Sequence, residues 1–191
     1  MPRFDRTSYG PLIGELLSAE RIPPLGPGKS NAALEKELRG AASGRLFAHT
    51  RIKDPAMADS CRSALWLYHD FLDESHTISQ SIETPTGSYW HGIMHRREPD
   101  FSNAAYWFRR VGRHPIFPQL AQAVCVCVSQ AQDAVKVRRL ATCADWDPFA
   151  FIKLCEAVYE TSGSDHDLCR RISLIEWQLL FDYSYRHAVG T

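Results

Sequence analysis

Residues 89–110 read YWHGIMHRREPDFSNAAYWFRR, and this stretch predicts the central feature of the fold. The turn signal is Glu98-Pro99-Asp100, because a proline disfavours helical geometry in the residue before it and an aspartate after it can cap a new helix. Ser102 is an alternative cap. We therefore expect two helices, over 88–97 and 102–111, joined at Pro99 into a helical hairpin.

Similar signals mark other helices on both sides of this hairpin. Asp54-Pro55 begins an amphipathic segment whose apolar residues recur at spacings of three and four, so one helix is expected to run from there to about His76. Asp165 is expected to cap a long final helix. The remaining helices are expected over 11–19, 30–39, 118–132 and from 148 to about 163. This pattern predicts an all-α fold, a single-domain bundle of about seven or eight helices.

The segment 21–28, RIPPLGPG, interrupts the helical pattern near the amino terminus. Proline and glycine at this density are typical of an irregular connection. We therefore divide the chain into an N-terminal arm with its connection, residues 1–28, and one helical domain, residues 29–191. At 191 residues the chain is long enough for one domain with a substantial core.

Composition and charge exclude several classes of partner. Lys plus Arg and Asp plus Glu are equal at 22 each, so no net charge attracts the molecule to nucleic acid or to an anionic membrane. The chain begins without the apolar core of a signal peptide, and no apolar run approaches the roughly 20 residues that cross a bilayer. We therefore expect a cytoplasmic protein with no nucleic-acid or membrane partner.

Several common catalytic motifs are missing from the sequence. There is no G-x-S-x-G nucleophile elbow and no complete phosphate-binding P-loop. Six cysteines are present, but none forms a CxxC pair, and we expect them to be reduced, buried thiols.

Histidines supply the sharpest functional hypothesis. His91 and His95 are four residues apart on one helix, so both rings lie on one face at a separation that a metal ion can bridge. His69 and His76 are seven residues apart on the expected preceding helix and also share a face. If the two helices pack together, these four side chains form a site for Zn, Fe or Ni. Alternatively, the spacing arises by chance and the rings are surface or hydrogen-bonded histidines.

Arginines and aromatic residues suggest a substrate for the same region. Arg96 and Arg97 precede the turn of the hairpin and Arg109 and Arg110 end its second helix, so their guanidinium groups can converge on an anion beside Tyr106. Glu74 or Glu98 is then expected to orient a histidine or to move a proton. These residues together predict a small-molecule site, with metal-dependent hydrolysis of an anionic substrate as its simplest chemistry.

A second reading of residues 89–110 requires no catalysis. The arginines can pair with Glu98 and Asp100 as a structural network while the aromatic side chains fill the core. The hairpin then serves as a contact surface of a helical binding or scaffold protein, for a protein partner or for a second copy in a homo-oligomer. The sequence leaves open whether the protein is an enzyme.

Overall fold

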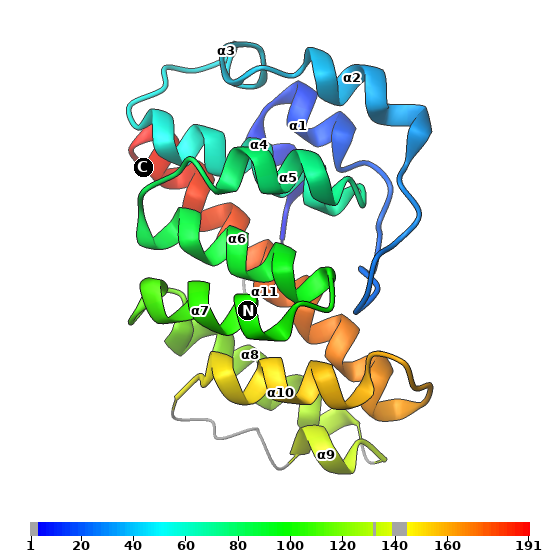
Figure 1. Ribbon diagram of the computed structural model, residues 1–191. Helices are drawn as coiled ribbons and strands as arrows, with labels where there is room; N and C mark the ends of the chain where they lie inside the picture. The colour runs from blue at the N-terminus through cyan, green and yellow to red at the C-terminus, as the bar shows by residue number, and fades with distance from the viewer. Residues whose placement is uncertain (1–3, 132, 139–144) are drawn as a thin grey trace.

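Helix α6 (Pro85–Arg97) lies at the centre of the molecule, and every residue from position 86 to position 97 is buried. It begins where Thr84 Oγ1 accepts a hydrogen bond from the Gly87 backbone NH at 3.0 Å, with a proline as its first residue. Figure 1 shows α6 between α5 (Leu72–Ser79) and α7 (Phe101–Val111), with α11 (Ser164–Val189) passing behind them. The helix starts three residues earlier than the sequence predicts.

The computed structural model describes residues 4–131, 133–138 and 145–191. Within these ranges the fold is all-α, as predicted, with no strand. The shorter helices are α1 (Pro11–Leu16), α2 (Glu35–Gly40), α3 (Ser43–Leu46) and α9 (Val135–Arg138), with the 3₁₀ turns Arg6–Tyr9 and Ala32–Leu34. The other long helices are α4 (Pro55–Tyr68), α8 (Phe117–Gln130) and α10 (Pro148–Val158). The predicted helix over 118–132 ends earlier, and position 132 lies outside the described residues.

Two clusters of buried apolar side chains form the core, and α11 contributes to both. The larger cluster joins α1, α4, α6 and α7 to the carboxyl-terminal half of α11, around Trp90, Trp177 and Phe181. The smaller one joins α8, α9 and α10 to the amino-terminal half, around Phe151 and Ile172. The predicted long final helix is therefore present, and Asp165 lies in its first turn after Gly163 at the cap position.

The helical hairpin forms at the predicted turn. Helix α6 ends at Arg97, and the Asp100 carboxylate caps α7 by accepting the backbone NH of Asn103 at 3.1 Å. The two helices approach closely at Gly92, because a Cβ there would lie 2.8 Å from the Phe108 ring. Glycine at this position thus lets the two backbones come together.

The single helix predicted from Pro55 to about His76 is wrong, because the chain breaks it into α4 and α5. The break lies at Asp70, which adopts a left-handed backbone conformation with φ of 62°. Its carboxylate is 95% buried and accepts hydrogen bonds from Arg21 and Arg97, both at 2.5 Å. A backbone conformation this costly for a non-glycine residue persists here because two charged partners hold the side chain in place.

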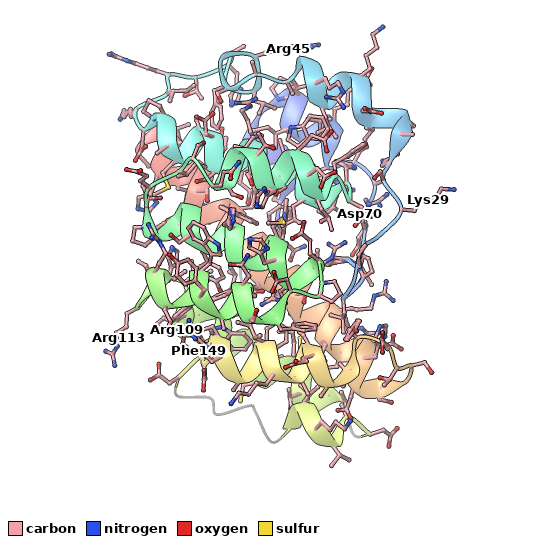
Figure 2. All side chains as sticks on the ribbon, viewed as in Figure 1. Lys29, Arg45, Asp70, Arg109, Arg113 and Phe149 are labelled. Atoms are coloured by element: carbon pink, nitrogen blue, oxygen red, sulfur yellow. The ribbon has the colours of Figure 1, made fainter. Side chains whose placement is uncertain are left out.

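The predicted N-terminal arm packs against the rest of the chain. Tyr9, Ile13, Leu16 and Leu17 belong to the larger core cluster. Figure 2 labels Lys29 and Asp70 on the same side of the molecule, where the irregular connection passes the end of α4. Together these contacts tie the first part of the chain to the centre of the fold.

Two further expectations about the chain meet different outcomes. No helix in the described ranges combines the length and apolar character that a bilayer span requires. Cys61, Cys127, Cys155 and Cys169 are free, but Cys125 is disulfide-bonded, so the expectation that all cysteines are reduced is wrong for this residue.

A buried ion pair joins α6 to α11. The guanidinium of Arg96 bonds both carboxylate oxygens of Glu176, and both side chains are at least 97% buried. The same carboxylate accepts the Tyr89 hydroxyl at 2.9 Å. Removing one partner of such a pair leaves an uncompensated buried charge, which costs far more stability than removing an exposed pair.

We expect Arg96→Met to lower the free energy of unfolding by about 3–5 kcal/mol, because it leaves the Glu176 carboxylate buried without its cation. The double variant Arg96→Met, Glu176→Gln should recover most of this loss, since the amide oxygen still accepts the Tyr89 hydroxyl. Arg186→Met, which breaks an exposed pair with Asp182, is the control and should cost less than about 1 kcal/mol. Denaturant unfolding measures all three, and equal losses for the two single variants would contradict this account.

Candidate metal centre

Three histidines from two helices meet beside the hairpin. His76 comes from α5, and His91 and His95 come from α6. One ring nitrogen from each lies within 4.8 Å of the other two, which makes this a group of potential metal ligands within the described part of the chain. The predicted pair on α6 therefore gains a third histidine from the neighbouring helix.

The two histidines of α6 face each other directly. Their Nε2 atoms are 2.9 Å apart, as expected for side chains one helical turn apart on one face. The His76 ring lies 4.7 Å from the His91 ring and 5.3 Å from the His95 ring, measured between centroids. His91 and His95 are buried while His76 is half-buried, so the cluster reaches solvent through α5.

The other ring nitrogens of the α6 pair have oxygen partners. His95 Nδ1 lies 3.0 Å from a carboxylate oxygen of Glu98, and His91 Nδ1 lies 2.9 Å from the hydroxyl of Ser79. Metal-binding histidines usually donate their second ring NH to a carboxylate, carbonyl or similar acceptor. Both rings thus have the outer contacts of ligands, with the Nε2 atoms pointing into the cluster.

Burial keeps these two histidines neutral. It lowers the pKa of His91 to about 3, with a smaller contribution from the neighbouring His95 and His76. It also lowers the pKa of His95, although the Glu98 carboxylate acts in the opposite direction. A neutral imidazole keeps the lone pair that a metal requires. At neutral pH the α6 pair therefore needs no deprotonation to bind a cation.

One face of α7 borders the cluster. Asn103, Trp107 and Arg110 recur at spacings of four and three and therefore lie along one stripe of the helix. The Asn103 amide nitrogen lies 3.1 Å from His95 Nε2, the Trp107 ring lies 4.1 Å from the His91 ring, and the Arg110 guanidinium lies 5.1 Å from the Trp107 ring. This stripe adds an amide, an aromatic surface and a cation to the surroundings of the histidines.

His69 does not join the cluster, because the α4–α5 break separates it from His76 and directs it elsewhere. Its Nε2 donates to the Leu16 carbonyl at 2.9 Å, and its Nδ1 accepts from the Asn31 amide at 3.2 Å. Both ring nitrogens are thus engaged in holding the N-terminal region, and burial lowers the pKa of the ring. The side chain has no free nitrogen to offer a metal.

Of the two glutamates predicted to assist the histidines, one lies at the cluster and the other does not. Glu98 contacts His95, as described above, and is a candidate for orienting that ring. Glu74 instead lies on the surface of α5, 3.0 Å from the Arg39 guanidinium. The structure brings Glu98 to the cluster and leaves Glu74 outside it.

The predicted anion-binding residues are also divided. Arg96 and Arg97 are buried in ion pairs with Glu176 and Asp70, so neither guanidinium is available to a substrate. Tyr106, Arg109 and Arg110 are exposed on α7. Figure 2 shows Arg109 and Arg113 at the edge of the molecule opposite Lys29. Arg110 and Tyr106 of the predicted set both contact Trp107, which itself touches His91.

Ser79 and Asn103 lie at the cluster but were not selected from the sequence, and Trp107 was expected only as one of the aromatic side chains that offer a stacking surface beside the arginines. Ser79 follows His76 by three positions, so helical spacing alone places it on the same face of α5. Asn103 and Trp107 share a stripe with Arg110. Their roles were missed because the relative rotation of α5, α6 and α7 decides which stripes meet.

His114 is a second buried histidine outside the cluster and contrasts with it. Its Nδ1 accepts from the Ile116 backbone NH at 3.4 Å, and its Nε2 lies 3.2 Å from the Thr86 hydroxyl. Burial, with a smaller contribution from His187, lowers its pKa from 6.5 to about 4. Because the unfolded chain binds a proton more readily, this ring stabilises the fold fully above pH 6.5 and less as the pH falls toward 4.

We expect the His114→Asn variant to lose less stability than the parent on acidification. Between pH 7 and pH 5 the His114 contribution to the free energy of unfolding should fall by about 2 kcal/mol, which the variant no longer loses. Denaturant unfolding at the two pH values measures the difference. The same pH dependence in parent and variant would show that the pKa of His114 does not differ between the folded and the unfolded chain.

Comparison with protein-family models, with curated proteins and with solved structures finds no match for this chain, so the interpretation of this centre depends on its geometry and chemistry.

Proposed function

We propose that His76, His91 and His95 bind one divalent transition-metal ion. The observation that carries this proposal is the convergence of three ring nitrogens within 4.8 Å, two of them on rings that burial keeps neutral. Three protein ligands with an open position are typical of catalytic zinc sites, whereas structural zinc sites have four. The arrangement therefore favours a site that takes a water molecule or a substrate as a further ligand.

The spacing and type of the ligands suit Zn²⁺, Fe²⁺ or Ni²⁺. Two nitrogens that bind one zinc ion at about 2.0–2.1 Å in tetrahedral geometry lie roughly 3.3 Å apart. The 2.9 Å between His91 Nε2 and His95 Nε2 is close to this separation. Imidazole ligands suit Zn, Fe, Ni and Cu, while Mg²⁺ and Ca²⁺ prefer oxygen ligands.

The chemistry that such a centre would supply is hydrolysis. A bound divalent ion lowers the pKa of a water ligand toward neutrality and so provides hydroxide at ordinary pH. In this proposal Glu98 orients His95 through Nδ1, while His76 occupies the solvent side of the site. The half-buried position of His76 supports access from solvent.

The proposed substrate is a small anion. Arg110 is connected to the cluster by side-chain contacts, because it packs on Trp107, which packs on His91. Arg96 and Arg97 take no part, since their guanidinium groups are already paired. A guanidinium beside a metal-bound water favours a phosphate or carboxylate on the substrate.

The alternative is a non-catalytic binding or scaffold protein that uses the exposed face of α7. Tyr106 is 48% exposed, and Arg109 and Arg110 lie beside it. Exposed aromatic and arginine side chains are common in protein interfaces, including those of homo-oligomers. This reading predicts no stoichiometric metal, so the same experiment separates the two functions.

Protein purified without an affinity tag should contain about one Zn, Fe or Ni ion per chain. The double variant His91→Ala, His95→Ala should lose this metal, and His76→Ala should weaken its binding, because each substitution removes a nitrogen ligand. Elemental analysis after gel filtration measures the content.

His187→Ala is the matched control, since it removes an exposed histidine of α11 and should leave the metal content unchanged. Metal-free parent protein that also fails to take up added Zn²⁺ would refute the site and favour the scaffold reading.

We expect zinc-loaded protein to hydrolyse p-nitrophenyl phosphate, and Arg110→Ala to raise the KM for this anionic probe about tenfold, which is the loss of one charge-assisted contact. Hydrolysis of the uncharged p-nitrophenyl acetate should not change. Arg113→Ala, which removes another exposed arginine, should affect neither probe. A KM for the phosphate that is insensitive to Arg110 would remove this residue from the substrate site.

A further inference from the structure

We propose that Ser79 is a positioning residue that fixes the tautomer of His91 and so turns its Nε2 lone pair toward the metal. This inference rests on the proposed metal site. Ser79 would not touch the ion itself but would act through His91 Nδ1, the ring nitrogen that does not face the metal. Hydrogen bonds to that nitrogen commonly set the orientation of a histidine ligand.

The direction of the Ser79–His91 hydrogen bond follows from the other partners of the hydroxyl. Ser79 Oγ lies 2.8 Å from the Ser75 carbonyl oxygen and 3.3 Å from the His76 carbonyl oxygen. A hydroxyl has one hydrogen, and a serine within a helix commonly donates it to the carbonyl four residues before. Toward His91 Nδ1, 2.9 Å away, Ser79 therefore acts as the acceptor. His91 must carry its hydrogen on Nδ1.

A third serine holds this arrangement in place. Ser63 Oγ on α4 lies 3.0 Å from both the carbonyl oxygen and the hydroxyl of Ser75 on α5. Ser63, Ser75 and Ser79 are all buried, with at most 1% of each exposed. Since a buried hydroxyl without a partner is costly, each of these hydroxyls is held in its hydrogen bonds. The serine chain thus connects α4, through α5, to the histidine ligand on α6.

The assigned tautomer explains the geometry of the α6 pair. With hydrogen on Nδ1, neutral His91 presents a lone pair at Nε2. His95 Nδ1 faces the Glu98 carboxylate, which only accepts hydrogen bonds when ionised, so neutral His95 also presents a lone pair at Nε2. Two lone pairs 2.9 Å apart repel unless a cation or a proton lies between them. The Asn103 amide can donate to the His95 lone pair, 3.1 Å away, but among the described contacts the His91 lone pair has no donor. Ser79 and Glu98 together therefore favour a metal-binding pair over a simple histidine–histidine hydrogen bond.

The first test reads the tautomer directly in metal-free protein. Nitrogen NMR of ¹⁵N-labelled imidazoles should show the hydrogen of neutral His91 on Nδ1 in the parent. In Ser79→Ala this preference should be lost, because Nδ1 no longer has an acceptor. A parent spectrum with the hydrogen on Nε2 overturns the proposal, and this result does not depend on whether any variant folds.

The second test measures Zn²⁺ affinity by competition with a chromophoric chelator. Ser79→Ala should bind Zn²⁺ about 10- to 100-fold more weakly than the parent, the range found for loss of an outer contact to a ligand. Ser60→Ala is the matched control, because Ser60 is equally buried and its hydroxyl bonds the Ala56 carbonyl four residues before at 3.0 Å. No hydrogen bond among the described residues joins Ser60 to a histidine, so the Zn²⁺ affinity of this variant should equal that of the parent.

The outcomes separate this inference from the site on which it depends. If the parent binds Zn²⁺ and Ser79→Ala binds it equally well, Ser79 has no positioning role while the metal site stands. If the parent binds no Zn²⁺, the metal site fails, and the nitrogen spectra still decide whether Ser79 sets the tautomer. Equal weakening in Ser60→Ala and Ser79→Ala would assign the effect to general loosening of the helices and overturn the proposal.

Discussion

Burial of α6 from its second residue to its last is the constraint on which the rest of the structure depends. The helix carries two histidines, two arginines, a tyrosine and a tryptophan into the interior, and buried polar groups are destabilising unless they are hydrogen-bonded or paired. The arginines, the tyrosine and the tryptophan therefore have partners in other parts of the chain. Glu176 on α11 accepts Arg96 and Tyr89, Asp70 accepts Arg97, and Ser184 accepts the Trp90 indole. The positions of α4, α5 and α11 around α6 follow in large part from these pairings.

The two buried histidines of α6 have a different kind of partner from the two arginines. Each arginine forms an ion pair with a carboxylate, whereas the Nε2 atoms of His91 and His95 face each other. Their Nδ1 atoms are occupied by Ser79 and Glu98, and the inner nitrogens face each other, with the Asn103 amide beside His95 Nε2. On this buried helix the arginines are fully paired, whereas the histidine nitrogens gather in a cluster. This contrast is the pattern expected of a binding site.

Local signals in the sequence were enough to predict the hairpin, the cap at Asp100 and the long final helix. They were also enough to place His91 and His95 on one face. The break at Asp70 was not predictable, because no glycine or proline marks it and its cause is long-range pairing with Arg21 and Arg97. That break removed His69 from the site. The prediction that Arg96 binds a substrate anion was wrong for a similar reason, since its ion-pair partner Glu176 is 80 residues away along the chain.

The carboxylate of Asp70 gives the beginning of the chain a part in the geometry of the centre. It forms ion pairs with Arg97, the last residue of α6, and with Arg21 in the N-terminal segment. Asp70 also lies two residues before α5, the helix that carries His76. The orientation of α5 relative to α6 therefore depends on a contact made almost fifty positions upstream. Any event that detaches that segment would alter the distance between the third histidine and the other two without touching any of the rings.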